Sequence, residues 1–233
     1  MSLLLAIETA TPVCSVALAR DGECVAIRET TSANAHSSLL TIYIEQLFQE
    51  AGYRYQDLDA VAVSMGPGSY TGLRIGVAAA KGLCYALEKP LIAVPTLQAM
   101  AEGMNCQLPI ANCPLLICPV IDARRMEVYC AVYNEQLEEI RPTDAVILHE
   151  NSFQDLLSNH VMIFGGTGAQ KCKPLLAGQP NAVFLDNFQA SAGYLIPLAE
   201  KRFFTGHFEN LAYFEPFYLK DFVAGKPKVK GLH

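Results

Sequence analysis

The stretch from Gly66 to Gly76 reads GPGSYTGLRIG and predicts the central unit of an α/β fold. An apolar run, residues 60–65, precedes it, and a long segment rich in small residues follows. Strand, glycine turn and helix in this order gather backbone N–H groups where an anion can bind. The stretch lacks the Gly-Lys-Ser/Thr of a Walker A loop, and its glycines do not fit Gly-x-Gly-x-x-Gly. Ser69 and Thr71 are suited to cap the helix.

Composition restricts the possible functions of the 233-residue chain. A net charge of −6 weighs against a duplex-binding surface, which needs a basic stripe. The basic cluster Lys226, Lys228 and Lys230 is expected to be a solvated tail. The eight cysteines include no Cys-x-x-Cys pair and lie mostly in apolar runs, which favours buried, reduced thiols. We therefore expect a soluble cytoplasmic protein with no signal peptide and no membrane-spanning segment.

The hydrophobic pattern predicts two α/β halves. Strands are expected at 3–9, 13–19, 24–29, 60–65 and 91–94, and helices at 37–51, 72–87 and from residue 96. The second half repeats this outline: an apolar strand ends at Asp122 as the first ends at Glu8, and another runs into a later glycine turn. We predict an N-terminal domain, 1–103, and a C-terminal domain, 104–233, whose last segment can pack back on the first.

Two helices carry a predicted partner surface. The apolar arc of helix 37–51 is wider than packing on its own sheet requires, since Leu39, Ile42 and Tyr43 extend it. Contacts within the chain or with a partner helix could equally explain that breadth. In helix 72–87, small residues recur every four positions and would let a neighbouring helix approach closely. The predicted contact residues are Leu39, Ile42, Tyr43, Leu73, Gly76, Ala80 and Cys84.

Several motifs together resemble the TsaB family, also called YeaZ. They are the glycine motif (Gly66, Pro67, Gly68, Thr71, Gly72 and Arg74), the upstream run Ile7–Ala10, the run Asp122–Tyr129, His36-Ser37, and Pro216–Lys220. The resemblance implies an actin-like fold of two related α/β domains with mixed sheets, the second one reduced. It also implies a non-catalytic subunit for N6-threonylcarbamoyladenosine (t6A) modification of tRNA. Such a subunit pairs with the catalytic paralogue TsaD, joins the ATPase TsaE, and meets tRNA only through the complex.

The catalytic chemistry of TsaD is not expected in this chain. TsaD-like proteins hold a metal with a His-x-x-x-His pair, whereas the matching stretch, residues 94–100, contains no histidine. Two imidazoles one helical turn apart would be needed on one face. We therefore predict no metal, no catalytic residue and no required cofactor. His36 is expected to be a helix-entry or surface residue or, alternatively, a partner contact. Arg74 is expected to order the loop or, alternatively, to contact an anion or form a hydrogen bond with a partner.

A nucleotide phosphotransferase is the alternative function. In actin-like ATPases, acids at the positions of Glu8 and Asp122 face the cleft and hold hydrated Mg²⁺ near phosphates. This interpretation predicts a nucleotide cleft formed by Glu8, Gly66, Gly68, Asp122, Gly165 and Gly166, with weak ATP or ADP binding. The other interpretation gives both acids structural roles. The leading hypothesis is a scaffold that presents its two long helices to TsaD, or to a second copy of itself when TsaD is absent.

Overall fold

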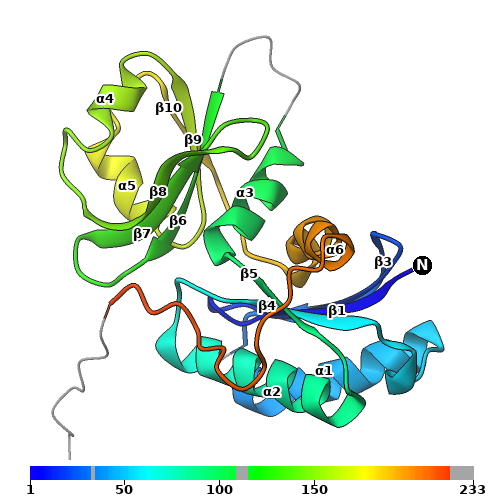
Figure 1. Ribbon diagram of the computed structural model, residues 1–233. Coiled ribbons are helices and arrows are strands. Elements are labelled where there is room, and N and C mark those ends of the chain that lie inside the picture. The colour runs from blue at the N-terminus through cyan, green and yellow to red at the C-terminus, as the bar shows by residue number, and fades with distance from the viewer. Residues whose placement is uncertain (33–34, 109–114, 221–233) are drawn as a thin grey trace, which may run out of the picture.

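Two five-stranded mixed sheets form the framework of the molecule. The computed structural model describes residues 1–32, 35–108 and 115–220. The first sheet has the order β3-β2-β1-β4-β5 and the second the order β10-β9-β6-β7-β8. In each, an antiparallel three-strand unit continues into two parallel strands, so the predicted duplication is present in the topology. Figure 1 shows the two sheets stacked with helices between and outside them.

The first lobe contains most of the elements expected from the sequence. Its elements are β1 Leu3–Glu8, β2 Cys14–Arg20, β3 Glu23–Thr30, α1 Ala35–Ala51, the 3-10 turn η1 Tyr55–Asp57, β4 Ala60–Ser64, α2 Tyr70–Leu87 and β5 Leu91–Val94. Asp21 and Gly22 both have positive φ and join β2 to β3, as expected of a tight hairpin. The predicted strands and long helices are thus found within one or two residues of their expected bounds.

The second lobe follows the same plan with shorter outer helices. Its elements are α3 Thr96–Asn105, β6 Leu115–Asp122, β7 Glu127–Tyr133, β8 Glu139–Ile147, α4 Gln154–Leu157, β9 Val161–Gly165, α5 Ala169–Leu175 and β10 Ala182–Leu185. The chain then returns to the first lobe through the 3-10 turn η2 Ala192–Leu195 and α6 Ile196–Phe204. α4 and α5 have four and seven residues, against 17 and 18 in α1 and α2, which makes this lobe the reduced one.

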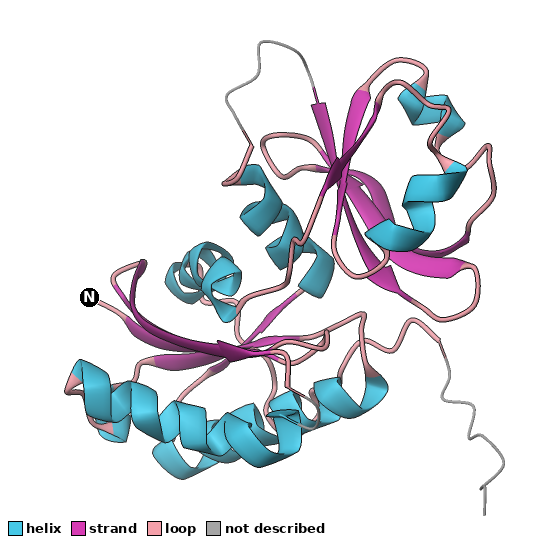
Figure 2. Cartoon of the chain, turned by 180° about the vertical axis from the view of Figure 1, so that it is seen from behind, coloured by secondary structure: helices cyan, strands magenta, loops and turns pink. Residues whose placement is uncertain are grey.

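Four strands of the first sheet, β1, β2, β4 and β5, are buried on both faces, so their sequences are mostly apolar, whereas the edge strand β3 is largely exposed. Along β1, Leu3, Leu5 and Ile7 pack toward α1 and α2, while Leu4 and Ala6 pack toward α6. Figure 2 shows α1 and α2 together beneath this sheet, on the side away from the second lobe. The broad apolar arc of α1 is partly explained within the chain, because Leu39 and Tyr43 pack against this core.

At the inner face of each sheet lies a helix that follows the other sheet in the chain. α3, which follows the first sheet in the chain, contributes Leu97, Met100 and Met104 to the core of the second sheet. α6, which follows the second sheet, contributes Ile196 and Ala199 to the first. Figure 1 shows both helices between the two sheets. The domain boundary predicted at residues 103 and 104 falls inside α3.

Candidate functional site

The glycine turn brings α2 close against the start of the chain. Ser69 is the N-cap of α2, and its side chain accepts a hydrogen bond from the Gly72 amide. The Ser69 amide in turn donates to the Ala10 carbonyl at 2.7 Å. A Cβ added at Gly76 would lie 2.2 Å from Thr9 Oγ1, so only glycine permits this approach. The motif therefore seats α2 on the turn after β1.

Glu8 lies beneath that turn and not in an open cleft. Its side chain is 1% exposed, and its Oε1 accepts a hydrogen bond from the Ala10 amide at 2.6 Å. Burial raises the pKa of this carboxyl to about 7, although hydrogen bonds from Ala10 and Ser64 oppose the shift. Glu8 is thus enclosed by the turn after β1 and does not face the solvent.

Asp122 is held by groups of its own lobe. Its Oδ1 accepts hydrogen bonds from the Arg124 amide at 2.6 Å and from Lys171 Nζ at 2.5 Å, and its amide donates to Thr167 Oγ1. Arg124 and Arg125 both have positive φ in this hairpin, a conformation that costs energy for residues other than glycine. Lys171 was not predicted, because it is 49 residues away in sequence and belongs to no recognisable motif.

The later glycine turn, which contributes Gly165 and Gly166 to the predicted nucleotide cleft, is also packed against its own lobe. A Cβ at Gly166, whose φ is +115°, would lie 2.4 Å from the Val120 carbonyl oxygen. Beside it, a Cβ at Gly165 would lie 3.0 Å from the Met104 side chain of α3. Gly166 is thus required by its positive φ and its contact with the β6 backbone, whereas a Cβ at Gly165 would need only a small shift of the Met104 side chain.

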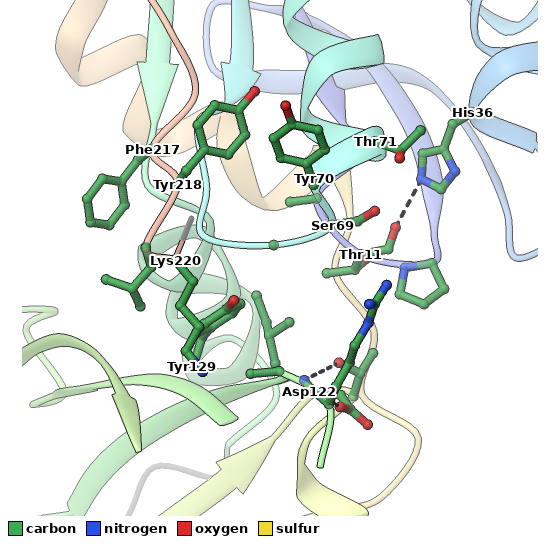
Figure 3. A pocket seen from close by; sticks show the side chains of 18 residues that line it. Thr11, His36, Ser69, Tyr70, Thr71, Asp122, Tyr129, Phe217, Tyr218 and Lys220 are labelled. Atoms are coloured by element: carbon green, nitrogen blue, oxygen red, sulfur yellow. Dashed lines mark hydrogen bonds between the residues drawn. The ribbon is translucent and has the colours of Figure 1, made fainter. Parts of the chain in front are cut away.

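A cavity of about 710 Å³ lies between the two lobes (Figure 3). Of the predicted nucleotide cleft, Gly68 and Asp122 line it, whereas Glu8, Gly66, Gly165 and Gly166 are not among its lining residues. The structure adds residues that the cleft prediction missed, namely Arg124, Tyr129, Thr167, Tyr218 and Lys220. His36 also lines it, and its Nε2 faces the carbonyls of Thr11 and Val13 at 3.0 and 3.1 Å. A ring nitrogen that donates to two carbonyls orders this turn, in line with the helix-entry role.

Comparison with known proteins establishes the family. A model of the TsaD family, described as tRNA N6-adenosine threonylcarbamoyltransferase, matches residues 26–173. "tRNA threonylcarbamoyladenosine biosynthesis protein TsaB" of Escherichia coli K12 is 35% identical over 232 residues, covering 96% of each chain. The chain belongs to the TsaB family. Over 62% of each chain, the TsaB protein of Bacillus subtilis is also 35% identical.

Solved structures of TsaB relatives show the same fold. YeaZ from Pseudomonas aeruginosa superimposes with a TM-score of 0.76 at 28% identity, covering 94% of this chain and all of the other. An activator of 2-hydroxyisocaproyl-CoA dehydratase from Clostridium difficile, at 10% identity and a TM-score of 0.52, shares the fold alone. The actin-like fold expected from the resemblance is confirmed.

The burial of α2 corrects the predicted partner surface of this TsaB-family chain. Leu73, Gly76, Ala80 and Cys84 are buried in the chain's own core, so they cannot contact another molecule in this conformation. α2 carries small residues on two faces, and the inward row was mistaken for the outward one. The outward row contains Ala78, Gly82 and Ala86. Of the three residues named on α1, Ile42 is exposed, whereas Leu39 and Tyr43 are half-buried.

Other predicted features of the chain can be placed within its described ranges. There, no group of three or more His, Cys, Asp or Glu side chains could hold a metal ion, and no helix has the length and apolar character to cross a bilayer. Five of the seven described cysteines are buried, while Cys24 and Cys106 are exposed. Arg74 donates to the Tyr70 hydroxyl at 3.1 Å and lies over its ring. The lysine cluster 226–230 lies outside the described residues.

Proposed function

We propose that this chain is a non-catalytic accessory subunit of t6A biosynthesis that binds a TsaD-like paralogue through the outer face of α1 and α2. Its relatives in Escherichia coli, Bacillus subtilis and Haemophilus influenzae are named as t6A biosynthesis proteins, which supports the pathway. A TsaE-like ATPase would join this assembly, and tRNA would be reached only through the complex. Any ATP or ADP binding by the chain itself is expected to be weak.

The main observation in support of this proposal is that Gly82 lies inside the helix α2. A helix-interior glycine costs about 0.5–1 kcal/mol relative to alanine. Among residues 1–32, 35–108 and 115–220, nothing lies within 4 Å of a Cβ built on Gly82, so packing within these ranges does not require a glycine there. Exposed Ala78 and Ala86 stand one turn to either side, and Tyr85 beside them is 81% exposed. A smooth row flanked by an exposed tyrosine suits a closely approaching partner helix.

The state of the two acids supports a non-catalytic role. A phosphotransferase needs a carboxylate free to hold hydrated Mg²⁺ near the phosphates. Here Lys171 neutralises the Asp122 carboxylate, and Glu8 is buried away from the cavity. These contacts weigh against the phosphotransferase alternative, and Mg-ATP turnover by the pure chain that is lost in Glu8→Ala would contradict our proposal.

The test is a pair of matched glycine substitutions. Gly82→Arg places a long cation on the proposed contact face, and Gly178→Arg places the same side chain on the exposed surface of the second lobe. In the part of the chain that the structure describes, neither glycine has an atom within 4 Å of its added Cβ, so both variants should fold. We expect Gly82→Arg to weaken binding to the TsaD-like partner at least about tenfold, or about 1.4 kcal/mol, in isothermal calorimetry. Gly178→Arg should bind like wild type.

Reconstituted tRNA modification provides the functional readout. With a TsaD-like and a TsaE-like protein present, t6A formation should fall for Gly82→Arg at limiting subunit concentration and recover at high concentration. Equal binding and equal t6A yield for the two arginine variants would show that this face is not the contact.

A further inference from the structure

The chain after α6 runs along the first lobe without regular secondary structure. Residues 209–220 form this segment, which we call the strap. The Glu209 amide donates to the Leu91 carbonyl at 2.9 Å, which covers the free edge of β5. Further on, Lys81 Nζ of α2 donates to the Ala212 and Phe214 carbonyls at 3.4 and 3.1 Å, and the Phe214 side chain enters the core beneath α2. The first half of the strap is therefore fixed to one lobe.

The second half of the strap passes between the lobes. The Phe217 amide donates to the Met65 carbonyl at 2.7 Å. A Cβ on Gly66 would lie 2.5 Å from the Phe217 carbonyl oxygen, so a glycine at this position is what lets the strap enter. The Tyr218 ring then packs on Tyr70 at a centroid distance of 4.9 Å. Figure 1 shows the segment passing α2 and rising toward β7.

At its end the strap contacts the second lobe. Lys220 Nζ forms an ion pair with the carboxylate of Glu127, the first residue of β7. The Glu127 side chain is 17% exposed, so the pair is partly shielded from solvent. Elsewhere the lobes meet through α3 and η2, where the Tyr194 ring packs against Gly103 and its hydroxyl accepts a hydrogen bond from Gln107. The strap thus adds a connection at the cavity, apart from the inner helices.

Phe217 has a particular place in this connection. It lines the 710 Å³ cavity and also a second one of about 450 Å³, whose walls include Met65, Pro95, Gln98 and Tyr133. The strap therefore stands as a partition between two spaces that both lie between the lobes.

We propose that the strap is a lock that holds the two lobes closed and divides the space between them. The Lys220–Glu127 ion pair holds the end of the strap on the second lobe, and the Phe217 side chain separates the two cavities. When the pair is broken, the end of the strap leaves the second lobe, the two cavities join, and the lobes are free to open about the α3–η2 contact. This inference does not depend on the proposed partner surface.

Hydrogen exchange measured by mass spectrometry tests the lock in the full chain. Lys220→Ala, Glu127→Gln and the double variant are compared with Lys201→Ala, which removes an exposed lysine of α6 with no ion pair in the described structure. We expect the first three to exchange about two- to fivefold faster in both the strap and the 122–129 hairpin, as loss of a partly shielded pair allows. The double variant should equal the single ones, because they break the same contact.

Salt and a cavity probe complete the test. Raising NaCl to about 1 M should increase exchange of the same segments in wild type, because it screens the pair. Phe217→Ala should bind more anilinonaphthalene sulfonate than wild type, whereas Phe204→Ala, which removes an exposed ring of α6, should not. Thermal melts by circular dichroism identify any variant that is simply unfolded. If exchange in the strap and hairpin matches that of Lys201→Ala, or if Phe217→Ala leaves dye binding unchanged, the lock does not exist.

Discussion

At Glu8, a single buried carboxyl makes the stability of the whole chain depend on pH. The folded pKa is about 7 and the ordinary value is 4.5, so the folded chain holds this proton more tightly than the unfolded chain does. The contribution of protonated Glu8 to the free energy of unfolding is therefore fully present below about pH 4.5 and is lost as pH rises through 7. The acid that in an actin-like ATPase would bind hydrated metal is here a group whose charged form is disfavoured.

Glu8→Gln should remove this pH dependence. Each pKa unit corresponds to about 1.4 kcal/mol, so the variant should gain up to about 3 kcal/mol over wild type at pH 8 and almost nothing at pH 4.5. Urea denaturation at the two pH values measures the difference. A gain or loss that is the same at both would mean that Glu8 does not titrate in this window.

At the scale of the element, α2 has two rows of small residues in different surroundings: one row is packed inside the lobe and the other faces outward. Gly76 faces inward against Thr9, while Gly82 faces outward into open space. Ala80, one of the predicted contact residues, is fully buried. An arginine there would bury an unpaired charge.

Alanine at the two glycines should change stability in opposite directions. Gly76→Ala should destabilise the chain by about 1–3 kcal/mol, because its Cβ collides with the Thr9 side chain. Gly82→Ala should stabilise it by about 0.5–1 kcal/mol, because it improves helix propensity without a clash. Paired urea melts give both values, and a loss of stability in Gly82→Ala would show that this glycine has a role within the monomer.

At the scale of the whole molecule, the outer helical face is expected to pair with a second copy of the chain when no TsaD-like partner is present. Related partners offer similar faces, and a self-complementary contact closes as a two-fold dimer. Sedimentation velocity should show a concentration-dependent dimer for wild type and Gly178→Arg. For Gly82→Arg the dissociation constant should rise at least about tenfold. Dimerisation that is unaffected by Gly82→Arg would place the contact elsewhere.

Local sequence determined most of the elements. Short apolar runs, the Asp21-Gly22 turn and the glycine turn before α2 are local signals, so the strands and both long helices could be predicted. Residues 175–215 had no clear period, and their structure was not predicted. In the structure they include β10, which pairs with β9, and η2 and α6, which are buried against strands of the first sheet far away in the chain.

The candidate site was predictable only in part, for a related reason. The types of residue at Glu8, Asp122 and the glycine turns could be read from the motifs, because motifs are local. Their environments depend on contacts between distant segments: Lys171 neutralises Asp122, the turn after β1 covers Glu8, and the strap meets Gly66. No periodic pattern encodes such contacts.

The sequence by itself determined the fold class, the repeated strand plan, the family resemblance and the presence of a smooth long helix. Only the tertiary structure decided which face of that helix is exposed, that Asp122 is paired with Lys171 while Glu8 is buried, and on which sheets α3 and α6 pack. The physical reason is that a small side chain permits close packing on either side of a helix. Which side is used depends on what the rest of the chain places there.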